Sequence, residues 1–405
     1  MLSESQKDLV KATVPVLREN GVALTGYFYN RMLTNNPNLK ETFNLGHQRS
    51  GAQAQALAGA VLAYAENIDD PSVLMPVIEL VSHKHVSLNI QAPDYDIVGE
   101  NLLHSISEVL KIPMEDDLIK AWAAAYGQLA NIFIETEKRI YDEHQKTKGS
   151  WLGWRKFKVA KKVAESAEIT SFYLQPSDGG PIAPHHAGQY VSVRVVVPEL
   201  GIKQPRQYSI SDCPREDHLR ISVKREEAKE DKVGGWVSNT LHQNVQEGDE
   251  IEVSAPTGNF FLFDSNKKNV LISGGVGLTP MVAMLNHLVS LNMPQPVQFI
   301  HACRDGKVHA MKQHLKDLKA QHTQLNTLVA YEFPQDSEVQ GEDYDVAGRL
   351  DLATLSDEQL PKDADYYLCG PAPFMQAQHK TLVARGIKPE QIHSEAFGTG
   401  GVNFS

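Results

Sequence analysis

The first part of the chain carries apolar side chains at intervals of three and four residues, which is the spacing of amphipathic helices. These runs cover about 21–34, 50–66, 73–90, 95–110 and 115–143, and prolines stand at their joins. Nothing in this region alternates as a strand does. We therefore expect an all-α domain, with a four-helix bundle and a globin as the competing architectures.

Beyond a small polar stretch, the pattern changes to strict alternation of apolar and polar residues. Alternating segments cover about 156–163, 168–175, 189–197, 207–211 and 218–225. Short strands at this spacing are typical of an antiparallel β-barrel.

In the last third, short apolar runs alternate with helical segments, beginning with the buried strand 269–273. This order predicts a parallel sheet with helices on both faces. The chain is thus predicted to be multidomain: all-α over 1–143, a linker over 144–153, an antiparallel β-barrel over 154–263 and an α/β parallel-sheet domain over 264–405.

Composition and charge argue against several classes of binding partner and cellular location. The 405 residues carry a net charge of −11 without a long basic run, which argues against nucleic acid. The three cysteines are far apart, which argues for a reducing compartment. No segment approaches a signal peptide or the roughly 20 apolar residues of a membrane span, so we expect a cytoplasmic protein without membrane insertion.

The stretch Arg206-Gln207-Tyr208-Ser209 joins a cation, an aromatic ring and a hydroxyl on one predicted strand. A flavin nucleotide needs such groups for its pyrophosphate, its ring and its polar edge. Further on, Gly235 and Ser238 open a short helical segment. The free N–H groups at its start could bind a phosphate, and an ordinary helix cap is an equally good interpretation.

A glycine-rich turn follows the buried strand 269–273 and starts a helix. It does not have the spacing Gly-x-Gly-x-x-Gly, but its glycines allow a diphosphate to approach the backbone. The residues of this candidate nucleotide turn are Gly274, Gly275, Val276, Gly277, Leu278 and Thr279. Cys369 ends another predicted strand at the sheet edge where ligands bind, although from the sequence alone a buried free cysteine is the better interpretation.

In the helical region His83 and His85 are two apart, so only one of them can face a given pocket. Gln53 and Leu57 are four apart and share a helical face, after Phe43. Together with Tyr29 on an earlier segment, these residues resemble a globin haem pocket. Tyr95 and Glu135, with the motifs around 43–49, 83–88 and 95–100, extend the similarity to the bacterial flavohaemoglobins, over nearly the whole chain.

The resemblance implies a role for each residue. His85 would bind the haem iron, with Tyr95 and Glu135 in contact with its imidazole. Phe43 would wedge the haem, Lys84 would belong to the cofactor site, and Tyr29, Gln53 and Leu57 would lie on the distal side. In the reductase part, Tyr190 and Tyr208 would flank the flavin, Arg206 would pair with its pyrophosphate, Cys369 would lie near the nicotinamide and Phe397 would cover the flavin.

The resemblance also implies one haem b, one FAD and NADH or NADPH as cofactors, and an enzymatic activity, nitric oxide dioxygenase. NAD(P)H would reduce FAD, FAD would reduce the haem iron, and O2 bound there would convert NO to nitrate. An oxygen-binding or haem-sensor protein whose reductase only keeps the iron ferrous is the alternative, followed by a flavin reductase with a vestigial globin. A lipid in the haem pocket, the choice of nucleotide at Arg304, the oligomeric state and the role of the tail after Gly398 stay open.

Overall fold

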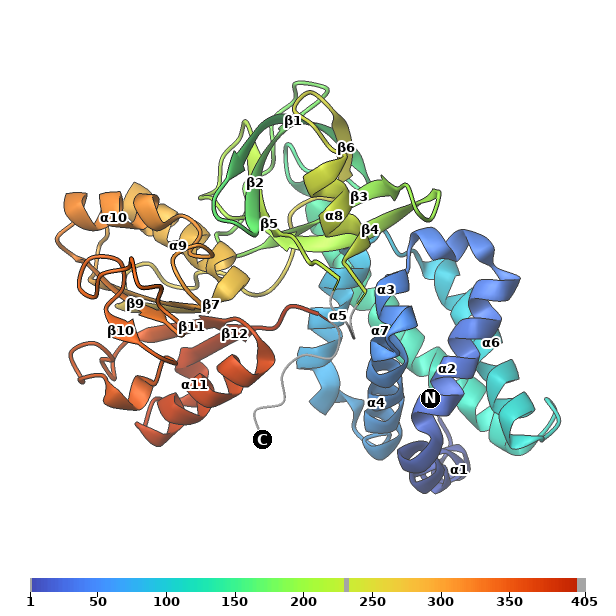
Figure 1. The fold of residues 1–405 in the computed structure, drawn as a ribbon. Coiled ribbons are helices and arrows are strands. Elements are labelled where there is room, and N and C mark those ends of the chain that lie inside the picture. Colours follow the sequence, from blue (N-terminus) through green and yellow to red (C-terminus); the bar gives the residue numbers. More distant parts are fainter. Residues whose placement is uncertain (1, 229–232, 399–405) are drawn as a thin grey trace. The chain divides into compact units, whose positions relative to one another are not determined.

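The computed structural model describes residues 2–228 and 233–398 (Figure 1). Seven helices come first: α1 (Glu4–Ala12), α2 (Val14–Asn35), α3 (Leu45–Arg49), α4 (Ala52–Glu66), α5 (Met75–Ser87), α6 (Ala92–Leu110) and α7 (Asp117–Lys146). Their starts follow from local chemistry, since Ser3 forms a capping box with Gln6 and the Asp116 side chain accepts from the Leu118 N–H. Long helices around one apolar core confirm the globin architecture.

That core is built from aromatic and aliphatic side chains of α2, α4, α6 and α7. Phe28, Met32, Tyr64 and Trp122 are almost completely buried in it. Burial of such side chains stabilises a fold by about 1.5–3 kcal/mol each. The core therefore fixes the helices that carry Tyr29, Gln53, Leu57 and Tyr95.

The strands that follow form a six-stranded sheet in the order β4-β3-β6-β1-β2-β5. They are β1 (Arg155–Ala164), β2 (Ile169–Pro176), β3 (Tyr190–Val197), β4 (Ile202–Ser209), β5 (Leu219–Lys224) and β6 (Glu250–Val253), and α8 (Trp236–Gln243) lies between the last two in sequence. The pairings of β1 with β2, of β2 with β5 and of β3 with β6 are antiparallel, as the alternation predicts.

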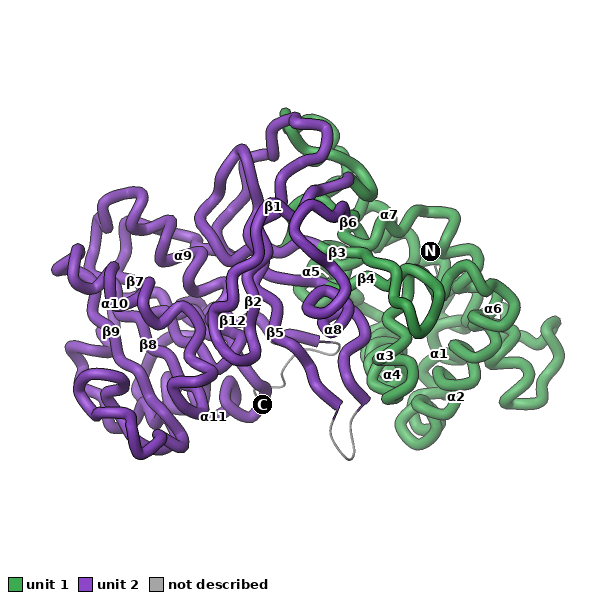
Figure 2. The backbone as a smooth tube through the Cα atoms, turned by 45° about the horizontal axis from the view of Figure 1, so that its top comes forward, with its two compact units in different colours: residues 1–155, 192–206, 252–259 green, residues 156–191, 207–251, 260–405 purple. Residues whose placement is uncertain are grey.

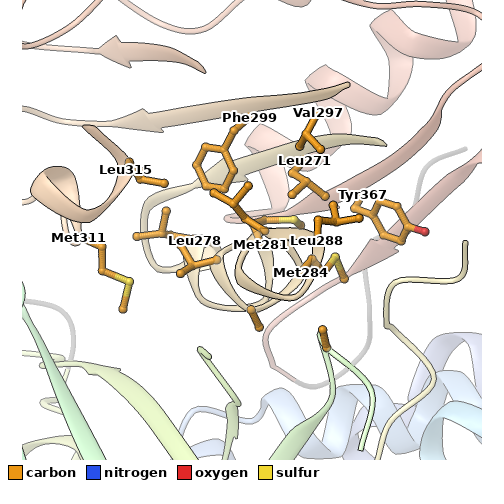
Figure 3. Packing of buried hydrophobic residues seen from close by; sticks show 14 of the residues in the cluster. Leu271, Leu278, Met281, Met284, Leu288, Val297, Phe299, Met311, Leu315 and Tyr367 are labelled. Atoms are coloured by element: carbon orange, nitrogen blue, oxygen red, sulfur yellow. The ribbon is translucent and has the colours of Figure 1, made fainter. Parts of the chain in front are cut away.

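The last part has a parallel sheet in the order β10-β9-β8-β7-β11-β12. Its strands are β7 (Asn269–Gly274), β8 (Val297–Cys303), β9 (Leu325–Tyr331), β10 (Val346–Ala347), β11 (Asp365–Cys369) and β12 (Ile392–Glu395), and its helices are α9 (Leu278–Ser290), α10 (Lys312–Gln321) and α11 (Ala372–Ala384). Figure 3 shows α9 packing Met281 and Leu288 against the sheet residues Leu271 and Phe299. The predicted fold class, a helical globin followed by an antiparallel sheet and a parallel α/β domain, is confirmed.

By its internal contacts the chain divides into two compact units (Figure 2). The first contains residues 1–155, 192–206 and 252–259, and the second contains 156–191, 207–251 and 260–405. The predicted bounds of the three domains and of the linker stay predictions. No helix in the described part of the chain is long and apolar enough to cross a membrane.

Candidate functional site: the haem pocket and the nucleotide-binding segments

His85, near the end of α5, is held by two oxygen atoms. Its Nδ1 lies 2.7 Å from Oε1 of Glu137 and 3.0 Å from the hydroxyl of Tyr95. The Tyr95 hydroxyl donates to the same Glu137 oxygen, at 2.5 Å. Because a carboxylate can only accept, Nδ1 carries the proton and the other ring nitrogen, Nε2, keeps its lone pair. That is the state of an imidazole that binds iron.

The carboxylate in this network is Glu137 and not Glu135, so the predicted role of Glu135 was wrong. The two residues are two positions apart on α7 and point about 200° apart on the helix. Glu135 is exposed, whereas Glu137 keeps only 3% of its surface accessible. Glu137 could have been found from the spacing, since it follows Phe133 by four residues and precedes Ile140 by three, which places it on the apolar face.

Burial and the neighbouring Glu137 charge raise the pKa of Tyr95 far above that of a free tyrosine. The Tyr95 proton is therefore fixed on the hydroxyl and directed at the carboxylate. Phe133 lies beside both rings, with centroids 5.6 Å from His85 and 6.3 Å from Tyr95. The network is thus closed on one side by an apolar wall.

The predicted distal residues come together on α2 and α4. Tyr29 is 7% exposed, and its ring meets that of Phe43 edge to face at 5.8 Å. Burial raises the pKa of Tyr29 well above its ordinary value, while a hydrogen bond with the Gln53 side chain acts in the opposite direction. Tyr29 therefore keeps its proton at neutral pH, and its hydroxyl can donate a hydrogen bond.

Two further features of α2 and α4 bear on ligand binding. The Oε1 atom of Gln53 is buried and has no hydrogen-bond partner in the described structure. Leu57 and Phe28 line an apolar cavity together with Val98. A buried oxygen without a partner is costly in a closed core, and a ligand that binds to it would remove this cost.

Cations gather at the rim of this compact unit. Burial, followed by the charge of Arg206, lowers the pKa of Lys84. The pKa of His47 falls to about 4 because of burial and the same two cations. The Gln204 side chain donates to the Lys40 carbonyl at 2.6 Å and accepts from the Leu45 N–H at 3.2 Å, which joins β4 to the segment before α3. Neighbouring cations of this kind favour an anionic group, such as a carboxylate or a phosphate.

The remaining predicted flavin residues lie in the second compact unit. Tyr190 begins β3, and Gln207, Tyr208 and Ser209 end β4. The Ser209 hydroxyl is buried and finds no partner among the described atoms, as expected of a group that meets a ligand.

The segment around α8 is built as a phosphate site would be. Gly235 is the N-cap of α8, and no side chain caps this helix end. The Ser238 hydroxyl donates back to the Gly235 carbonyl at 3.1 Å and accepts from the Glu226 N–H at 3.3 Å. The N–H groups at the start of the helix are thus left for another acceptor.

The candidate nucleotide turn runs from the end of β7 into α9. A side chain at Gly277 would place its Cβ 2.3 Å from the Cys369 carbonyl oxygen, so this position needs glycine for the turn to lie against β11. Cys369 is completely buried, and burial raises the pKa of its thiol well above the usual value. It is therefore a neutral thiol, which fits either a packing role or a place beside an uncharged ring.

Arg304 and Phe397, both in the second unit, differ in their contacts: Arg304 forms an ion pair, and Phe397 is partly exposed. The Arg304 guanidinium forms an ion pair with Glu168, so it is not a free surface cation. Phe397 is 45% exposed, which leaves a ring face available for stacking. The tail that begins at Thr399, where we expect the sequence to differ from that of the family, lies outside the described residues.

Several functional candidates were not predicted. Glu137 and Phe133 complete the His85 network, and Gln204 joins β4 to the helical part. Thr257 and Gly258 hydrogen-bond His83 from a segment far along the chain. Only Glu137 and Phe133 have a signal in the local sequence, since the others depend on contacts between distant segments.

Comparison with known proteins agrees with this arrangement. Residues 26–133 match the globin family, 156–262 the oxidoreductase FAD-binding domain and 271–380 the oxidoreductase NAD-binding domain. A flavohemoprotein of Bordetella parapertussis is 55% identical over 404 residues, covering 99% of this chain and 100% of its own, and that of Rhizobium meliloti is 47% identical over 98% of each chain.

Two solved structures are also similar. A flavohemoglobin of Malassezia yamatoensis with bound FAD and heme is 29% identical, has a TM-score of 0.84, and covers 98% of this chain and 100% of its own. The FAD/NAD-binding domain of a nitric oxide dioxygenase from Vibrio cholerae is 40% identical, has a TM-score of 0.56, and covers 60% of this chain and 98% of its own.

Proposed function

Because this chain belongs to the flavohemoprotein family, and is an NAD(P)H-dependent oxidoreductase with globin, FAD-binding and NAD-binding domains, we propose that it is a nitric oxide dioxygenase. The substrates would be NO, O2 and NAD(P)H, and the product nitrate. The relative from Vibrio cholerae, which carries this activity in its name, supports the proposal.

The His85 network is the observation that carries the proposal. A carboxylate at 2.7 Å from the imidazole N–H makes the ring a stronger electron donor through its other nitrogen. An electron-rich ligand favours oxygen chemistry over reversible oxygen carriage. The oxygen-carrier alternative gives no reason to bury Glu137 beside this histidine.

The residues present fit the cofactors that the family implies. His85 offers its Nε2 to iron, the buried Gln53 oxygen has no partner in the described structure, and Leu57 supplies an apolar surface. Lys84 and Arg206 offer positive charge to acidic groups of a cofactor. When bound, the flavin would supply hydride acceptance from the nucleotide and single-electron transfer, and the haem held by His85 would supply oxygen binding for the oxidation of NO.

The protein's own residues then have separate tasks. Glu137 holds the proton of His85 at Nδ1, and Tyr95 holds Glu137. Tyr29 donates its proton toward the distal space, where a partly negative oxygen atom would accept it. Its burial excludes water that would compete for that hydrogen bond.

The test is NO consumption against NADH consumption, with haem-loaded and haem-depleted protein. Conversion of NO to nitrate by O2 takes one electron per NO, so each NADH should support two NO in the loaded protein. The depleted protein should oxidise NADH with an added dye and leave NO untouched. NADH use that does not respond to NO in the loaded protein would favour the oxygen carrier.

We further propose that NADH is used in preference to NADPH. Arg304 and Glu332 follow the strands β8 and β9 at the sheet edge where a dinucleotide's ribose is read. Arg304 is paired with Glu168, and Glu332 accepts from Arg349 at 2.7 Å, with the carboxylate of Asp305 close by in sequence. An additional phosphate would lie beside these carboxylates, and both arginines described at this edge already pair with a carboxylate.

The ratio of flavin reduction rates with NADH and NADPH checks this. Glu332→Gln should raise the relative rate with NADPH, and Asp317→Asn, an exposed carboxylate on α10, should leave the ratio unchanged. A parent protein that prefers NADPH would overturn this assignment and leave the dioxygenase proposal intact.

A further inference from the structure

We propose that His83 and Ser87 are positioning residues, which fix the rotation of α5 about its own axis and thereby hold His85 in its hydrogen-bonded geometry. This inference rests on the proposed role of His85 as the iron ligand. It concerns residues of the first compact unit alone. It assigns a function to the face of α5 that looks away from His85.

The helical geometry separates the two faces. Residues two apart on an α-helix point about 200° apart, and residues four apart point about 40° apart. His83 and Ser87 therefore share one face, and His85, midway between them in sequence, points to the opposite one. The sequence singled out His83 and His85 as competing ligands, and this geometry gives each a separate role.

His83 is bonded to the segment that follows β6. Its Nδ1 lies 2.7 Å from the Thr257 hydroxyl and accepts from the Gly258 N–H at 3.2 Å. Thr257 is 1% exposed. Gly258 has φ +115°, which other residues rarely adopt, so glycine is needed to direct this N–H at the imidazole.

Ser87 is bonded to a second distant segment, the strand β3. The Ser192 hydroxyl donates to the Ser87 hydroxyl at 2.8 Å, and Ser87 donates to the Lys84 carbonyl at 2.7 Å. The Ser192 N–H in turn donates to the Ser254 hydroxyl at 2.8 Å, and the Ser254 N–H donates to the Ser192 carbonyl at 2.9 Å. The two contact points of α5 thus rest on one connected framework, formed by segments 192–206 and 252–259.

A small rotation of α5 would be enough to break the His85 network. Side-chain atoms at the rim of a helix lie roughly 5–6 Å from its axis, so a turn of about 10° moves them by about 1 Å. The bond between His85 Nδ1 and Glu137 is 2.7 Å long, and about 1 Å more takes it out of hydrogen-bonding range. Contacts at two points on the opposite face resist this turn.

The test uses the holoprotein with the substitutions His83→Leu and Ser87→Ala, alone and combined. The iron–histidine stretch of the ferrous haem, measured by resonance Raman, should fall in frequency, as we also expect for Glu137→Gln. Backbone amides of residues 86–88 should exchange with deuterium roughly tenfold faster, because a buried hydrogen bond is lost. Haem content and NADH-driven dye reduction should stay as in the parent.

His83→Asn serves as the rescue, since its Oδ1 accepts where Nδ1 does, and it should restore the parent stretch. Ser72→Ala, which removes an exposed hydroxyl ahead of α5, is the matched control for Ser87→Ala. An unchanged stretch in the double variant would overturn the proposal, whether or not exchange increases. A parent protein without a histidine-ligated haem would instead refute the proposed function, so the two failures are distinguishable.

Discussion

The two sides of the haem pocket use a tyrosine in opposite ways. On the side of His85, the Tyr95 hydroxyl donates its hydrogen bond to Glu137, so the protons of Tyr95 and of His85 Nδ1 are both directed at one carboxylate. On the other side, Tyr29 is buried beside Gln53, whose Oε1 has no partner in the described structure. The Tyr95 hydroxyl is paired within the protein, whereas we infer that the Tyr29 hydroxyl is available to a bound ligand.

The difference shows how one fold can both fix a metal ligand and leave room for a substrate. A fully paired polar network is rigid, because each change of geometry costs a hydrogen bond. A buried polar atom without a partner is costly until something binds it. We therefore infer that the side of His85 tunes the iron, and that the side of Tyr29 favours a small polar ligand, which would pair a buried polar atom.

Removal of the ligand itself should have the largest effect. His85→Ala should lose haem, because no other described residue offers a lone pair from the closed network. FAD content and NADH-driven dye reduction should remain, and the ratio of haem to flavin absorbance measures both at once. His83→Ala is the control and should keep its haem, since His83 faces away from His85. A normal haem spectrum in His85→Ala would show that the ligand has been misassigned.

Loss of the distal proton comes next. A hydrogen bond to a partly charged acceptor contributes about 1.5–3 kcal/mol, so Tyr29→Phe should speed dioxygen release by roughly ten- to a hundredfold. NO turnover should fall with it, as flash photolysis and NO-electrode measurements would show. If the release rate stays the same, Tyr29 only packs against Phe28 and Phe43.

The proximal charge should have a smaller effect, because a glutamine keeps the size and some of the hydrogen bonds. Glu137→Gln removes an anion beside His85, which destabilises ferric relative to ferrous iron. We expect the haem potential to rise by about 40–90 mV, equivalent to about 1–2 kcal/mol. Redox titration measures it directly.

The chain offers a matched control two residues away. Glu135→Gln changes an exposed charge on the same helix and should leave the potential where it was, since exposed charges are screened. Equal potentials in the two variants would mean that Glu137 has no influence on the iron. The inference that the network of His85, Tyr95 and Glu137 tunes the iron would then be wrong.

Part of this pocket could be expected from the sequence, because its residues resemble a globin haem pocket. Tyr29 and Gln53 lie together and Tyr95 contacts His85, while their roles toward a haem stay predictions. The confusion of Glu135 with Glu137 arose because both are glutamates on one long helix, and the family pattern alone does not fix which face each takes. The apolar spacing around residue 137 would have decided it.

Other features could not be predicted for a different reason. The bonds from Thr257 and Ser192 to α5 span 174 and 105 residues of sequence. Local pattern carries no information about such pairs, since a serine or threonine in a strand is equally suited to solvent. The same holds for the pairing of Arg304 with Glu168, which changes a candidate phosphate reader into a neutralised charge.

The smallest expected effect tests whether the distal tyrosine is oriented by its neighbour. If the Gln53 amide donates to the Tyr29 oxygen, Gln53→Leu removes a neutral hydrogen bond worth about 0.5–1.5 kcal/mol and should speed dioxygen release by roughly two- to tenfold. The double variant with Tyr29→Phe is more informative than either alone. If Gln53 acts only through the Tyr29 hydroxyl, adding Gln53→Leu to Tyr29→Phe should change the release rate very little, so the two effects should not add. Full additivity would mean that Gln53 contacts the bound ligand directly. Tyr29 and Gln53 would then be two independent hydrogen-bond donors to the ligand, whereas we infer that only Tyr29 is one.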